Sequence, residues 1–128
     1  MFLTVNASDE RPLYQQIEDG IKALIARGDL REGTALPSVR HVASSLGVNL
    51  NTIAIAYRQL QEEGLVTVRH GAGAVVASRR LRGGRPEELR KPLRTALTQM
   101  ILAGLKYREI VAAVREELES LQQRGDLR

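Results

Sequence analysis

Apolar residues recur every three to four positions in three segments of the first half of the chain, the pattern of helices with one buried face. The first segment lies between Pro12 and Gly28, and proline and glycine are favoured at the start and just past the end of a helix. Its apolar positions are Leu13, Ile17, Ile21, Leu24 and Ile25. The stretch from Asp29 to Pro37 lacks such a pattern, and we expect it to be a connecting loop.

Two further helices are expected with only a short turn between them. Ser38 and Asn49 are good N-cap residues, and Gly47 and Gly64 are placed to end the two helices. The buried faces are predicted to consist of Val39, Val42, Ala43 and Leu46 in the first helix, and of Ile53, Ala56, Tyr57 and Leu60 in the second. Two short helices joined through a glycine are typical of a helix-turn-helix.

After the third helix the pattern changes from helix to strand. Residues 65–69 are rich in β-branched side chains, residues 70–73 are turn-like, and residues 74–77 are apolar again, which predicts a β-hairpin. Three helices followed by a hairpin indicate an α+β fold, a winged helix-turn-helix, over residues 1–78.

The remaining chain divides into a basic linker at residues 79–86 and a two-helix module at residues 87–128. Two short helices cannot bury their apolar stripes by themselves, so pairing with a second copy is the expected solution, a homodimer. The predicted dimerisation residues are Leu89, Leu93, Leu97, Met100, Ile101, Ile110, Val114 and Leu118. Lys106, at the start of the second helix, has no side-chain acceptor, but Glu109 is placed to accept from its amide.

Charge is unevenly distributed along the chain, whose formal net charge is +4. Residues 1–78 carry seven Lys and Arg against eight Asp and Glu, whereas residues 79–94 carry seven against two. This basic segment has two interpretations. It either lies along DNA phosphates and strengthens binding in a salt-dependent way, or forms a solvated hinge.

Several classes of protein are disfavoured by composition. The absence of cysteine excludes disulfides, thiolate zinc sites and cysteine nucleophiles. We find no apolar run long enough for a membrane span, no signal-peptide pattern, no metal-ligand spacing and no catalytic constellation. A cytoplasmic, non-enzymatic protein without metal or cofactor is expected. A small-molecule effector stays open.

Several ordered motifs resemble the GntR family of bacterial winged-helix transcription factors. They are PLYQQI at 12–17, GTALPSVR at 33–40, LGVNLNTI at 46–53, AYRQL at 56–60, EGLV at 63–66 and GAG at 71–73. The short two-helix tail is similar to that of the YtrA-like branch. The resemblance implies binding to double-stranded DNA as a dimeric repressor, often of transport genes. This chain departs from many family members at two positions. It has Leu50 where they carry an arginine, and Ala54 where they often carry a polar or basic residue.

The resemblance and the helical pattern together predict which residues bind DNA. In this architecture the third helix enters the major groove, and its outward face would carry Asn51, Ala54, Ile55, Arg58 and, at the distal end where it would repel phosphate, Glu62. Ala54 and Ile55 are suited only to apolar contact, as with a thymine methyl group. Arg40 corresponds to a family arginine that contacts DNA, often guanine; a solvated surface arginine is the alternative.

The full set of predicted DNA-binding residues is Ser38, Arg40, Asn49, Asn51, Thr52, Arg58, His70, Gly71 and Gly73. Thr52 is suited to a phosphate, and Asn49 is either a helix cap or a DNA contact. Glycines at the hairpin tip allow close approach to the DNA backbone or minor groove. A competing hypothesis is a helical interaction module whose winged helix binds a protein, which the low positive charge of residues 1–78 favours.

Overall fold

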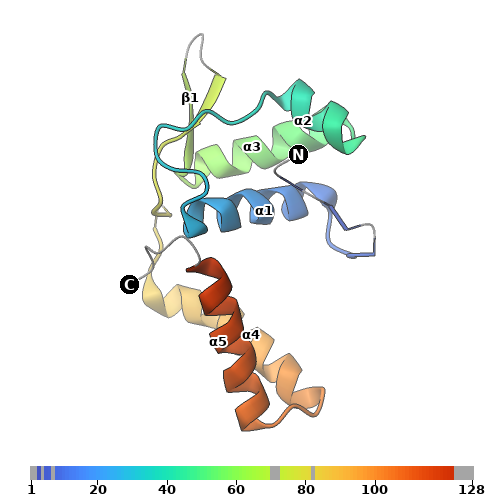
Figure 1. Ribbon diagram of the computed structural model, residues 1–128, viewed down its shortest axis with the longest axis vertical. Coiled ribbons are helices and arrows are strands. Elements are labelled where there is room, and N and C mark those ends of the chain that lie inside the picture. The colour runs from blue at the N-terminus through green and yellow to red at the C-terminus, as the bar shows by residue number, and fades with distance from the viewer. Residues whose placement is uncertain (1–2, 4, 7, 70–72, 82, 123–128) are drawn as a thin grey trace.

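The computed structural model describes residues 3, 5–6, 8–69, 73–81 and 83–122. In chain order the elements are α1 (Leu13–Arg27), α2 (Val39–Leu46), α3 (Leu50–Glu62), β1 (Val66–Arg69), β2 (Gly73–Val76), α4 (Pro86–Leu102) and α5 (Tyr107–Leu121). The first three helices and the hairpin form a winged helix-turn-helix, and α4 and α5 form a two-helix tail beneath it (Figure 1). The predicted α+β fold is confirmed.

The caps expected from the sequence form as local hydrogen bonds. The Ser38 hydroxyl accepts from the His41 amide at 3.1 Å, and the Asn49 side-chain oxygen accepts from the Asn51 amide at 2.8 Å. Between these two helices, Gly47 has a φ of +67°, which is costly for residues with a Cβ. Together these residues fix where α2 begins and ends and where α3 begins, and so set the turn between the two helices.

The hydrophobic core lies where α1, α2 and α3 meet the hairpin. Its most deeply buried side chains are Ile17, Ile21, Ile25, Val42, Ile53, Leu60 and Val76. Tyr57, which the sequence placed in the core, is only 8% exposed. Helix α3 packs against α1, α2 and β1, so the position of α3 is determined from three sides.

The segment between α1 and α2 does more than connect two helices. The amide of Leu36 donates to the Ala74 carbonyl and that of Gly33 to the Val76 carbonyl, both at 2.8 Å. The Val76 amide in turn donates to the Thr34 carbonyl at 2.9 Å. Residues 33–36 therefore pair with β2 on the edge that β1 leaves open, and this pairing fixes the base of the wing.

The chain before α1 is held by a buried glutamine that the sequence patterns did not single out. The side-chain oxygen of Gln16 accepts from the Asn6 amide at 3.0 Å, and its nitrogen donates to the Arg11 carbonyl at 3.1 Å. Leu3 is buried in the same core. Gln16 satisfies its polar atoms with backbone groups, as a buried amide must.

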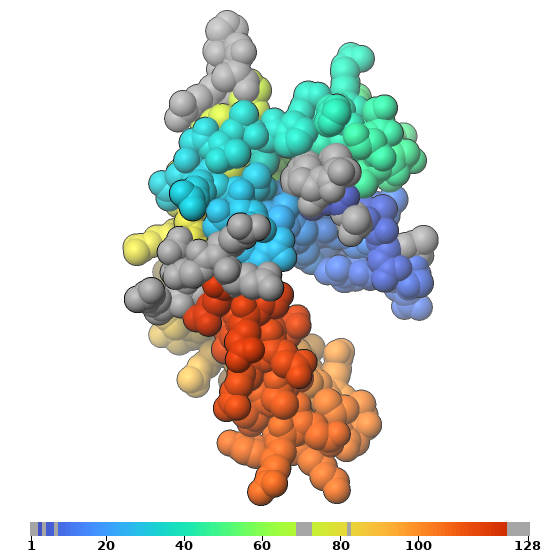
Figure 2. All heavy atoms as spheres, in the orientation of Figure 1, coloured from blue at the N-terminus to red at the C-terminus, as the bar shows by residue number. Residues whose placement is uncertain are grey.

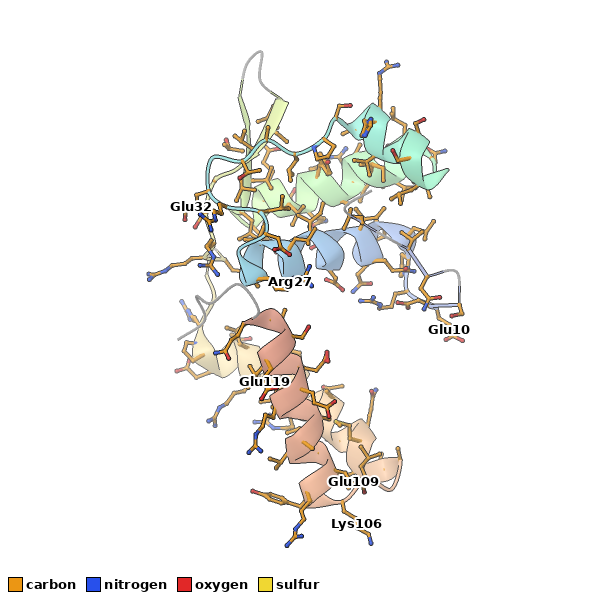
Figure 3. The ribbon with its side chains drawn as sticks, viewed as in Figure 1. Glu10, Arg27, Glu32, Lys106, Glu109 and Glu119 are labelled. Atoms are coloured by element: carbon orange, nitrogen blue, oxygen red, sulfur yellow. The ribbon has the colours of Figure 1, made fainter. Side chains whose placement is uncertain are left out.

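The tail helices form a lobe that projects from the winged-helix part (Figure 2). Helix α5 returns toward the winged helix and contacts α1 (Figure 1). At the far end of the lobe, Lys106 and Glu109 lie close together, and the Glu109 carboxylate accepts from the Lys106 amide at 2.9 Å, as expected (Figure 3). Helix α4 continues through Pro92, which has no amide to donate to the Glu88 carbonyl.

Apolar side chains of the tail remain largely uncovered. Ile101 is 62% exposed and Tyr107 is 82% exposed. Between α4 and α5 lies an open apolar groove of about 530 Å³. It is lined by Leu93, Leu97, Ile101, Tyr107, Ile110, Val111, Val114, Arg115 and Leu118. Within the described part of the chain, no helix combines the length and apolarity needed to cross a membrane.

The first arginine of the basic segment has a structural role that neither interpretation of that segment foresaw. The guanidinium of Arg79 donates to the Ala26 carbonyl at 2.7 Å and to the Ile25 carbonyl at 3.3 Å. These carbonyls belong to the last turn of α1, where a cation is favoured by the helix dipole. The Arg79 amide also donates to Glu32 at 3.3 Å. Arg79 thus fastens the start of the linker to α1.

Candidate nucleic-acid interface

A partly buried hydrogen bond joins the middle of α3 to the residue before the α2 cap. The Tyr57 hydroxyl donates to the Pro37 carbonyl at 2.6 Å, and burial raises the pKa of this hydroxyl to about 12. Pro37 directly precedes the Ser38 cap. This bond therefore fixes the first turn of α2, which carries Arg40, relative to α3.

Exposed polar side chains line this side of the winged helix. Arg40 extends from the first turn of α2, and Asn51 and Arg58 are exposed on α3. Thr52 is partly exposed beside Asn51. Asn49 is exposed as well, and its side-chain oxygen is used in the α3 cap. Hydrogen-bonding side chains are thus exposed on both helices of the helix-turn-helix, Asn51 and Thr52 in the first turn of α3 and Arg58 two turns further along.

A groove of about 670 Å³ separates α3 from the wing. Its walls include Ser38 of α2, Ala54, Arg58 and Gln61 of α3, and Val68 and Gly73 of the hairpin. The sequence patterns did not nominate Gln61 or Val68. Gln61 lies at the edge of the predicted outward face of α3. Val68 is two residues after the buried Val66, so its side chain is on the same face of the strand, but it lies beyond the core.

Of the three predicted wing contacts, the structure describes Gly73. His70 and Gly71 lie outside the described residues. Gly73, at the start of β2, is exposed and has a φ of +70°, the left-handed region where glycine is favoured. A side chain there would meet open space, so the backbone conformation and not crowding accounts for glycine at this position.

The opposite end of α3 carries an acidic cluster. Lys22 of α1 lies 3.1 Å from Glu18 and 2.7 Å from Glu63, so one cation serves two carboxylates. Burial raises the pKa of Glu18, Glu63 raises it further, and Lys22 opposes the shift. Burial by itself lowers the pKa of Lys22, but the two carboxylates outweigh it and the pKa is raised. This cluster makes the C-terminal end of α3 unfavourable for phosphate.

Metal-ligating side chains do not gather in groups of three or more within the described part of the chain. The arrangement of exposed arginine, asparagine and threonine side chains on α2 and α3 is suited to hydrogen bonding with a polyanion. Arginine can bond guanine through two parallel hydrogen bonds, and asparagine can do the same with adenine.

The sequence pattern of the bacterial regulatory proteins of the gntR family matches residues 13–76, from the start of α1 to the end of β2. The chain belongs to the GntR family. It is a winged-helix DNA-binding transcription regulator, and the residues matched by the family are those that build the α2–α3 face and the hairpin.

Three similarities extend this assignment. The HTH-type transcriptional repressor YtrA of Bacillus subtilis is 26% identical over 117 residues, which are 89% of this chain and 90% of YtrA. A Listeria monocytogenes structure described as a transcriptional antiterminator has a TM-score of 0.83 at 28% identity, over 95% of this chain and 93% of that one. The AraR DNA-binding domain in complex with operator ORX1 has a TM-score of 0.52 at 27% identity, over 59% of this chain and 93% of AraR's. The chain is therefore YtrA-like in its tail as well as in its winged helix.

Proposed function

We propose that this GntR-family regulator is a dimeric repressor that binds a pseudo-palindromic operator. The observation that carries the proposal is the face formed by α2 and α3, where Arg40, Asn51 and Arg58 are exposed beside the groove under the wing. The similarity to a repressor over nine-tenths of both chains, and to a domain bound to its operator, supports it.

Each helix of the face has a distinct proposed task. Arg40 bonds guanine, and Asn51 bonds a base edge in the major groove. Thr52 and Arg58 bond phosphates, and the free amides at the capped starts of α2 and α3 favour phosphate as well. Ser38 and Asn49 orient these helix starts. His70, Gly71 and Gly73 bring the wing to the DNA backbone.

The tail supplies the second half of the proposal, because its apolar groove needs a partner. Filling the groove of about 530 Å³ with the same helices of a second copy would cover the exposed Leu93, Ile101 and Leu118 on both chains. A two-fold dimer would let two copies of α3 read half-sites about 34–36 Å apart, one helical turn of DNA.

The DNA part is tested by selecting bound duplexes from a random pool and measuring affinity against salt. We expect an inverted repeat and a steep loss of affinity with salt, because phosphate contacts release counterions. Arg40→Ala should weaken binding about 5- to 150-fold per half-site and relax one base position. Arg31→Ala, an exposed arginine in the segment after α1, is the matched control. Unchanged preference in Arg40→Ala would remove that residue's role. No duplex binding at low salt would instead favour a protein-binding winged helix.

The dimer is tested by sedimentation of Leu118→Asp and of Ser120→Asp, a matched control. Both residues are exposed on α5, but only Leu118 lines the apolar groove. We expect the wild type and Ser120→Asp to sediment as dimers and Leu118→Asp as a monomer with the helix content retained. A wild type that is monomeric at the concentrations used for DNA binding would overturn the dimeric part of the proposal.

A further inference from the structure

The first residue of α3 is a leucine that does not join the core. Leu50 is 46% exposed, whereas Leu46 and Val48, on either side of the α2–α3 turn, pack against the core. The Asn49 cap directly before it fixes the first turn of α3. A large apolar side chain is therefore presented outward at the end of α3 that would enter the major groove first.

A second apolar position continues this surface along the helix. Ala54 follows Leu50 by one turn, so the two lie on the same face of α3, and Ala54 lines the groove under the wing. Asn51 and Arg58, which are polar and exposed, lie seven residues apart along one side of this strip. Base edges met by this part of α3 would find a small apolar strip beside hydrogen-bonding side chains.

The chemistry of the major groove restricts what this strip can recognise. Among the four bases, only thymine offers an apolar group there, the C5-methyl, and the remaining positions are hydrogen-bond donors or acceptors that an alkyl side chain leaves unpaired. We propose that Leu50, with Ala54 beside it, reads a thymine methyl group in each half-site. This inference rests on the proposed DNA-binding function and adds the base-contacting residue and the base.

The test removes the methyl group and not the base pair. In the selected operator, each thymine of a half-site is replaced singly by deoxyuridine, which keeps every hydrogen-bonding group. At one thymine per half-site we expect the affinity of the wild type to fall about fourfold, the effect of losing one buried methyl group. In Leu50→Ala the same replacement should have no effect, because the alkyl partner is gone.

A second measurement adds a methyl group in place of removing one, so that the expected result is a gain in affinity and not a loss. Cytosine placed at the critical thymine position should bind better when it is 5-methylcytosine, for the wild type and not for Leu50→Ala. Leu13→Ala is the matched control, since Leu13 is an exposed leucine at the first position of α1. It should keep the full response to both base changes.

The outcomes separate this inference from the function on which it rests. Selective binding with no penalty for deoxyuridine at any thymine, or an equal penalty in Leu50→Ala, would overturn the role of Leu50 and leave the regulator assignment intact. A selected site without a thymine in its half-sites would do the same. Absence of duplex binding by the wild type would overturn both.

Discussion

The hydrogen bond from Tyr57 to the Pro37 carbonyl leads to two independent predictions, one for the free energy of unfolding and one for its pH dependence. Tyr57→Phe deletes one hydroxyl from a side chain that is 8% exposed and leaves the ring in place. The bond of 2.6 Å links α3 to the residue before the α2 cap. Its loss should cost about 1 kcal/mol of unfolding free energy near neutral pH, because the carbonyl loses its partner in a partly buried site.

The second part is a pH dependence whose sign follows from the pKa. Burial raises the pKa of Tyr57 from its ordinary value of 10.0 to about 12. Between these values the folded protein keeps a proton that the unfolded chain has lost, so the stability contributed by Tyr57 is complete below the unfolded pKa and declines as pH rises. At about pH 11 the wild type should have lost about 1.4 kcal/mol from this group, a loss that Tyr57→Phe does not suffer.

The two effects oppose each other, so the wild type should be more stable at about pH 7 and the difference should vanish near about pH 11. Urea unfolding of both proteins along this pH range measures the difference, and groups common to both cancel. Tyr14→Phe, at an exposed tyrosine of α1, is the control for hydroxyl removal and should change stability little. A difference between wild type and Tyr57→Phe that stays constant with pH would refute the assignment of a buried, proton-retaining hydroxyl.

Three further predictions concern stability and are measured by urea unfolding. Arg79→Ala should lose about 1 to 2 kcal/mol because the last turn of α1 loses its cationic cap, while the exposed Arg80→Ala should be neutral; equal effects would contradict the clamp. Because burial raises the pKa of Glu18 in the folded state, its stabilising contribution is lost as pH rises, so Glu18→Gln should gain stability relative to the wild type as the pH rises above the ordinary value of 4.5. The exposed Glu10→Gln should show no such trend. Gly47→Ala should lose about 1 kcal/mol, since φ is +67° there; an unchanged midpoint would refute this.

Much of the winged helix was predictable because its signals are local. Ser38 and Asn49 cap helices through amides two or three residues away, and Gly47 ends α2 within the same turn. The spacing of the buried Ile53 and Leu60, seven residues or about two helical turns apart, marks the buried face of α3. Both partners of each such interaction are close together in the sequence, so the interaction can be predicted from the sequence.

The groove under the wing could not be predicted in this way. Its walls come from α2, α3 and the hairpin, and residues such as Gln61 and Val68 join it only when these elements pack. Position along one helix or strand predicts which way a side chain points, but not which other element stands opposite. The exposed Leu50 is a similar case, because Val48 two residues before it packs partly buried against the core, and the local sequence does not tell these two apolar side chains apart.

By itself the sequence determined the order and type of the elements, their caps, the hairpin and the amphipathic tail helices. Tertiary structure alone decided that residues 33–36 pair with β2, that Lys22 is shared by Glu18 and Glu63, and that Arg79 closes the end of α1. The carbonyls that the Arg79 guanidinium contacts are more than fifty residues away in the chain. The physical reason is that helix propensity and capping act over one turn, whereas charge pairing and strand pairing depend on which segments the core brings together.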